Sequence, residues 1–206
     1  MTDVELAQGL MEGRAGAFDE FVETYRTKVF QYSYSMCGQR EDAEEVAQET
    51  LLSVFQHLHQ IQDPVHLKAW VFRIAKNACL MKRRKSVFAP SMEDSLADID
   101  TADDSPEPDR VILAEERKHL LCGAILSLPQ IYRSVVLLRD VEELSTEETS
   151  EVLGVSTDVV KTRLKRARRE LRSRLDTATP GEWHLEGPAP LDITCKRKLM
   201  EAWSKG

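Results

Sequence analysis

The chain has 206 residues, 42% of them hydrophobic, which suffices for one or two small domains with apolar cores. Its net charge of −7 does not by itself suggest a nucleic-acid partner, but the charge is unevenly distributed along the chain. The polar first residues and the lack of any apolar run of membrane length argue against secretion and membrane insertion, and they predict a cytoplasmic protein.

Apolar residues recur every three to four positions in the first part of the chain, and no segment has the alternation typical of a strand. This spacing predicts a short helix around residues 4–11 and three longer helices, separated by breaks at residues 37–40 and 61–65. Pro64 is expected to mark the start of the third long helix, because proline fits the first turn of a helix. We therefore expect an all-α domain over residues 1–85.

Residues 86–110 differ in composition from the segments on either side. They contain three prolines, and residues 91–109 hold eight acidic side chains and no lysine or arginine. Removing these eight negative charges changes the net charge from −7 to +1, so the overall charge hides a slightly basic remainder. Because too few apolar residues are present for a core, the composition predicts an acidic, proline-containing linker.

A second small all-α domain is expected over residues 111–175. Its first helix is predicted at residues 111–126, and Pro129 is expected to open another helix that runs to Asp140.

Two helices around one glycine close this second domain. Ser145 and Glu148 fit a capping box, in which each side chain satisfies a free amide at the start of a helix. Gly154 can adopt the left-handed conformation that ends this helix, and Ser156 can cap the next one. The turn of about four residues is the length that a helix-turn-helix uses.

The last of these helices combines an apolar stripe with a strongly basic remainder. Val160, Leu164, Ala167, Leu171 and Leu175 recur at spacings of three and four and are expected to face a core. Glu170 is the one acidic side chain among the basic ones, too few for a salt-bridged face in solvent. The excess of positive charge instead suits neutralisation of phosphates and reading of bases. The basic side chains are Lys161, Arg163, Lys165, Arg166, Arg168, Arg169, Arg172 and Arg174. The sequence therefore predicts a DNA-binding helix.

Residues 176–206 begin with prolines and glycines that break regular structure. Leu199, Met200 and Trp203 then follow at spacings that could place them on one face of a short helix. Such a helix would dock on the chain itself or on a regulator, and a frayed end with incidental apolar residues is the alternative.

Catalysis and metal binding have little support in the sequence. His57, His59 and His66 lie close together and could bind a metal with Glu45 or Asp63, but His57 and His59 point in different directions on a helix. The cysteines are widely spaced, which is typical of reduced thiols rather than of a zinc site or a disulfide framework. They are Cys37, Cys79, Cys122 and Cys195. We expect a protein that is not an enzyme and that uses no metal and no cofactor.

The chain resembles a bacterial extracytoplasmic-function (ECF) RNA polymerase sigma factor, of group four in the sigma-70 family. Three stretches carry the resemblance: DAEEVAQETLLSVFQHL, then LKAWVFRIAKNACLMKRRK, then LPQIYRSVVLLRDVEELSTEETSEVLGVSTDVVKTRLKRARREL. Together they cover about residues 10–175. The resemblance implies a protein that binds core RNA polymerase and directs promoter recognition, DNA opening and transcription initiation. A stand-alone helix-turn-helix regulator is the alternative, although it would not need the first two stretches.

The resemblance implies that an acidic helix of the first domain binds core polymerase. On this chain the matching residues are Asp42, Glu45, Gln48 and Glu49. An ordinary solvated helix face is the alternative explanation for these side chains.

The resemblance also implies two DNA-binding regions. In the first domain, the loop 61–67 and the helix after it would capture an unstacked base of the downstream promoter element, with Trp70 as a stacking or a core residue. The matching residues there are Lys68, Trp70, Arg73, Lys76 and Asn77, followed by Lys82, Arg83 and Arg84 as phosphate contacts. In the second domain they are Thr157, Asp158, Lys161, Thr162 and Arg163 at the start of the recognition helix, and Arg166 as a phosphate contact.

The chain departs from the family pattern at three positions. Thr149 and Ser150 stand where an aliphatic residue and alanine are usual, which questions the packing of the first helix of the helix-turn-helix. Asp158 stands where glycine is common and suggests an altered base preference. An anti-sigma factor is expected as a further partner, and the acidic linker is either a polymerase-threading segment or a simple spacer.

Overall fold

The computed structural model describes residues 2–61, 63–88 and 120–177, and within these ranges every regular element is a helix. The acidic linker apart from its first three residues, most of the helix predicted at 111–126, and the apolar residues of the tail lie outside the described residues. No helix in the described part of the chain is both long and apolar enough to cross a membrane.

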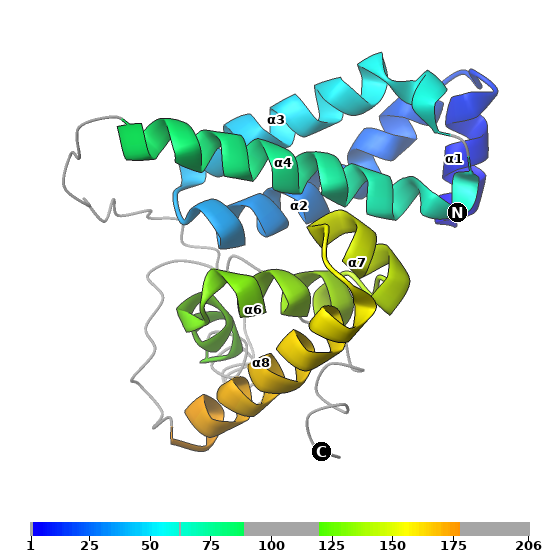
Figure 1. The fold of residues 1–206 in the computed structure, drawn as a ribbon. Coiled ribbons are helices and arrows are strands. Elements are labelled where there is room, and N and C mark those ends of the chain that lie inside the picture. The colour runs from blue at the N-terminus through cyan, green and yellow to red at the C-terminus, as the bar shows by residue number, and fades with distance from the viewer. Residues whose placement is uncertain (1, 62, 89–119, 178–206) are drawn as a thin grey trace, which may run out of the picture.

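Three long helices form the first unit: α2 (Ala17–Cys37), α3 (Arg40–Gln56) and α4 (Leu67–Phe88). Figure 1 shows them packed side by side, with the shorter α1 (Asp3–Met11) across one end. Phe21, Tyr25, Val46 and Phe72 are fully buried between them, as the helical spacing of the apolar residues predicts. The expected break after Cys37 is confirmed, because Gly38 ends α2 with φ of 84°.

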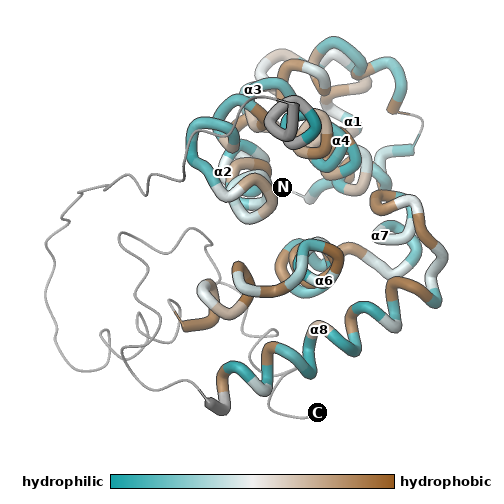
Figure 2. Tube along the Cα trace, turned by 60° about the vertical axis from the view of Figure 1, so that its left-hand side comes forward, coloured by the Kyte–Doolittle hydropathy of each residue, from teal (hydrophilic) through white to brown (hydrophobic). Residues whose placement is uncertain are grey.

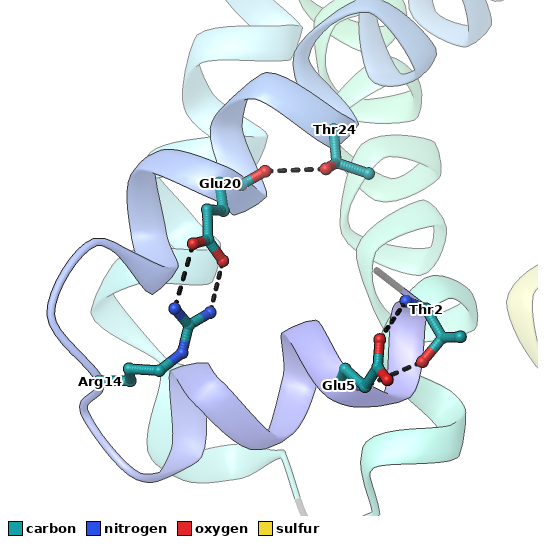
Figure 3. A network of polar contacts seen from close by, with 5 residues as sticks. All are labelled: Thr2, Glu5, Arg14, Glu20 and Thr24. Atoms are coloured by element: carbon teal, nitrogen blue, oxygen red, sulfur yellow. Dashed lines mark hydrogen bonds and ion pairs between the residues drawn. The ribbon is translucent and has the colours of Figure 1, made fainter.

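Polar contacts attach α1 to the bundle (Figure 3). Thr2 and Glu5 form a capping box at the start of α1. Beyond its end, both terminal nitrogens of Arg14 bond the Glu20 carboxylate near the start of α2. The Tyr25 hydroxyl donates to Asp3 Oδ1 at 2.9 Å and joins the two helices, with Tyr25 buried and Asp3 half-buried.

Pro64 does not begin α4 directly. Two 3₁₀ turns, η1 (Leu58–Gln60) and η2 (Pro64–His66), connect α3 to α4, and Pro64 opens the second of them. Asp63 caps η2 by accepting from the Val65 amide at 3.0 Å. The proline signal was therefore placed correctly in a helical turn, but the long helix starts only at Leu67.

The second unit consists of a helical segment at residues 120–127, α6 (Gln130–Val136), the π-helical turn η3 (Leu137–Val141), α7 (Thr146–Leu153) and α8 (Thr157–Thr177). Its core is made of aliphatic residues such as Ile125, Leu138, Val160 and Leu171. Figure 2 shows hydrophobic and hydrophilic residues alternating along α8, as expected for a helix with one buried stripe.

The two units pack against each other through α4 and α7, and α7 lies between α4 and α8 in Figure 1. Polar contacts between described residues also cross the boundary. Arg133 Nη1 donates to the Ser35 carbonyl at 2.7 Å, and Lys68 Nζ lies 3.9 Å from Glu142 Oε2. Both side chains of the second contact are largely buried, at 18% and 6% exposed.

Candidate polymerase and nucleic-acid interfaces

The four residues predicted to bind polymerase lie together on α3. Asp42, Glu45 and Glu49 follow at spacings of three and four and share one face of the helix. Gln48 and Glu49 are exposed, the Glu45 side chain is 55% exposed, and Asp42 is half-buried. We call these four residues the acidic surface.

Lys82, which was predicted to hold a phosphate, contacts the acidic surface. Its Nζ lies 3.3 Å from Asp42 Oδ1 and donates to Glu45 Oε2. The hydrogen bond to Glu45, assisted by Asp42, raises the pKa of Lys82 above its ordinary value. In this arrangement Lys82 therefore orients the two carboxylates.

Three of the predicted base-reading residues share one face of α4. Trp70, Arg73 and Asn77 follow at spacings of three and four; Arg73 and Asn77 are exposed, and Trp70 is half-buried. Lys68 differs, because it points to Glu142 of the second unit.

The remaining predicted contacts of α4 lie between its middle and its C-terminal end. Arg84 is exposed and Lys76 is half-buried. The side chain of Arg83 lies outside the described residues.

A cleft of about 610 Å³ opens beside the base-reading face of α4. The cleft is lined by Trp70 and Arg73 of α4, by the segment that connects α3 to α4, and by Glu151 and Val152 of α7. An indole beside a guanidinium suits an unstacked base. Glu151, however, places negative charge where a nucleic acid would enter.

The helix-turn-helix has the predicted local structure. Ser145 and Glu148 form the capping box, with Ser145 Oγ accepting from the Glu148 amide at 3.0 Å. Gly154 ends α7 with φ of 68°. Thr149, which departs from the family pattern, is fully buried, and its hydroxyl has no hydrogen-bond partner among the described residues, so we expect a desolvation cost at this position.

The start of α8 projects away from the core. Asp158, Lys161, Thr162 and Arg166 are exposed, and Arg163 is half-buried. Thr157 is half-buried as well. Because Val160 and Leu164 anchor the opposite side, the predicted recognition residues form one outward surface.

The basic face of α8 is not wholly available to a ligand, contrary to the sequence prediction. Arg168 makes a two-pronged contact with the Asp140 carboxylate, whose side chain is 6% exposed. Arg174 donates to Ser127 Oγ and Glu170 Oε1, both at 2.9 Å. These two arginines stabilise the domain, and sequence periodicity could not reveal partners that lie 28 and 47 positions away.

The structure describes His57, His59 and His66 and does not group them as ligands of one metal ion. His57 Nδ1 lies 2.8 Å from the Ser53 carbonyl, and the His57 and His59 rings are 6.2 Å apart. Among the described residues, no three side chains of histidine, cysteine, aspartate or glutamate are grouped as metal ligands.

Family models match both units of the chain. The model for sigma-70 region 2 matches residues 21–87, and the model for sigma-70 region 4 matches residues 121–171. The ECF RNA polymerase sigma factor SigW of Bacillus subtilis is 29% identical over 80% of this chain and 91% of its own length. SigE of Mycolicibacterium smegmatis is 31% identical over 77% of this chain and 62% of its own length.

Two solved structures share the fold. CnrH, in complex with the cytosolic domain of CnrY, superposes with a TM-score of 0.58 at 24% identity, over 86% of this chain and 99% of that one. The sigma factor RpoE of Bartonella quintana, in complex with the anti-sigma factor NepR, gives 0.59 at 19% identity, over 80% of this chain and 100% of that one.

The chain belongs to the sigma-70 family, and its relatives are of the ECF type. It is a transcription initiation factor that directs RNA polymerase to promoters, and not an enzyme. The match to region 2 favours this function over that of a stand-alone helix-turn-helix regulator, which has no use for a polymerase-binding domain.

Proposed function

We propose that the acidic surface on α3 binds core RNA polymerase, and that the exposed start of α8 reads the upstream promoter element. The observation that carries this division is that the two surfaces lie on separate units, each with a buried core behind it. In this account Asp158, Lys161, Thr162 and Arg163 enter the major groove, and Arg166 contacts phosphate.

We propose that the face of α4 with Trp70, Arg73 and Asn77 captures a base of the downstream element in the adjoining cleft. In the described arrangement Glu151 and Val152 of α7 line part of that cleft. A base held in this cleft would lie next to the Glu151 carboxylate, and we propose that the two units separate before the downstream element is bound. Separation would also release Lys68 from Glu142 to contact DNA.

Within this account Lys82 acts indirectly. By holding Asp42 and Glu45 it keeps the acidic surface ordered for polymerase, while Arg84 and Lys76 are left to contact phosphates, together with Arg83.

An inhibitory partner and a cellular location are also proposed. An anti-sigma factor would bind the chain and keep the two units packed against each other. This proposal is supported by the similar RpoE structure, which was solved with the anti-sigma factor NepR. The chain would act in the cytoplasm, where RNA polymerase works.

The division of labour is tested by paired variants. Glu45→Lys with Glu49→Lys is expected to abolish capture by immobilised core polymerase, because it reverses the charge of the acidic surface. Arg163→Ala is expected to leave that capture unchanged and to weaken binding of the holoenzyme to promoter DNA by about 1–3 kcal/mol if Arg163 reads a guanine. Equal loss of polymerase capture in both variants would refute the assignment.

A further inference from the structure

Two cysteines that are far apart in the sequence meet inside the first unit. Cys37 is the last residue of α2, Cys79 lies in the middle of α4, and their Sγ atoms are 3.5 Å apart. Both are thiols in this structure. The sequence positions differ by 42, so only the folded bundle brings the pair together.

We propose that Cys37 and Cys79 form an intramolecular disulfide when the protein meets a peroxide or a small-molecule disulfide. The two sulfur atoms would have to approach from 3.5 Å to about 2.05 Å. The disulfide would close a loop that contains all of α3, and with it the acidic surface.

The exposure of the two thiols sets the order of the reaction. Cys37 is half-buried and therefore reachable, whereas Cys79 is 1% exposed. With hydrogen peroxide, the Cys37 thiolate attacks one oxygen to give a sulfenic acid, and hydroxide leaves. Cys79 sulfur then displaces the hydroxyl group from Cys37 as water, and its own proton is lost. Overall two thiols and one peroxide give one disulfide and two waters.

The surroundings of Cys79 suit a second, resolving thiol more than a first target. Its hydrogen bond with Cys37 and its burial raise the pKa of Cys79. The nearby buried Ser33 hydroxyl lowers the pKa of Cys79, but by less. Cys79 therefore stays protonated while Cys37 is a thiol, and oxidation of Cys37 to the sulfenic acid removes the thiol contact that is the largest cause of the raised pKa of Cys79.

The disulfide is expected to stabilise the first unit without rearranging it. Cross-linking a loop of this length removes conformational entropy from the unfolded chain. For a domain of this size, the thermal midpoint of the oxidised form should rise on the order of 10 °C.

The test uses the full chain treated with hydrogen peroxide, followed by tryptic mass mapping without reductant. We expect a cross-linked peptide pair that contains Cys37 and Cys79 and is lighter by two hydrogens, a raised thermal midpoint, and reversal of both by dithiothreitol. Cys37→Ala and Cys79→Ala should each abolish the cross-link, and Cys122→Ala, a change in the other unit, should keep it. A Cys37 that stops at sulfinic acid, a cross-link to Cys122 or Cys195, or a lowered thermal midpoint would each overturn the proposal.

Discussion

Removing the negative charge of Glu142 should favour an open state, in which the two units are separated, over the closed arrangement, in which α4 packs against α7. Glu142 is 4% exposed and faces Lys68 of the first unit at 3.9 Å. At an effective dielectric constant of about 20 the pair attracts by about 4 kcal/mol at most, and desolvation and side-chain entropy reduce the net value to about 1–2 kcal/mol. Glu142→Gln leaves Lys68 without this charge in a largely buried place, so the ratio of open to closed chains should rise about 5- to 30-fold.

Trp70 reports the separation of the two units, because it lines the cleft that α7 also lines. With Trp183 and Trp203 replaced by phenylalanine, acrylamide quenching of Trp70 fluorescence should be stronger in Glu142→Gln than in the parent chain. Glu143→Gln is the matched control, since it removes a charge from the exposed neighbouring residue.

A double variant with exchanged charges distinguishes loss of the ion pair between Lys68 and Glu142 from a nonspecific weakening of the contact between the two units. Lys68→Glu together with Glu142→Lys restores opposite charges and should recover part of the closed population that either single reversal loses. Equal quenching in Glu142→Gln and Glu143→Gln, with no recovery in the swap, would refute the view that this ion pair holds the units together.

Three further predictions concern stability. Thr149→Val should stabilise the protein to urea by about 1–2 kcal/mol, because it removes a buried hydroxyl with no hydrogen-bond partner; a loss of stability would mean that the hydroxyl is satisfied. Gly154→Ala should cost about 1 kcal/mol at φ of 68°, and Gly154→Asn should cost less; equal thermal midpoints for all three chains would contradict the left-handed cap. Hydrogen bonding to Arg14 lowers the pKa of Glu20 below 4.5. The contact therefore stabilises the fold above that pH, and its contribution is lost as the pH falls through the lowered pKa. The thermal midpoint of Glu20→Gln should fall less steeply in acid than that of the parent chain, and an unchanged slope would count against the contact.

Local structure was predictable from the sequence where it depends on near neighbours. The capping box at Ser145 and Glu148, the stop at Gly154 and the buried stripe through Val160 and Leu171 each follow from residues a few positions apart. Such signals are local because the backbone hydrogen bonds of a helix, and the caps at its ends, involve residues within about one turn.

Contacts between distant positions were not predictable. Arg168 and Asp140, or Cys37 and Cys79, carry no shared motif, and each pair meets only after the helices have packed. The left-handed Glu143, with φ of 59°, was also missed, since glutamate gives no signal for that conformation.

The residues of each candidate surface were predictable from the sequence, but the contacts between these surfaces and the neighbouring helices were not. The acidic surface and the exposed start of α8 follow from helical periodicity and family resemblance. The contacts of Lys82 with Asp42 and Glu45, and the position of Glu151 in the lining of the cleft, depend on how α3, α4 and α7 pack. Single-sequence patterns do not encode that packing.

Run-off transcription with purified core RNA polymerase on a promoter library tests the central claim most directly. The protein should confer specific initiation on a subset of promoters that core polymerase alone does not use. Glu45→Lys with Glu49→Lys should abolish that initiation through loss of polymerase binding, and Arg163→Ala should reduce it while polymerase binding stays intact. A wild-type chain that binds promoter DNA but neither associates with core polymerase nor changes its transcripts would contradict the account.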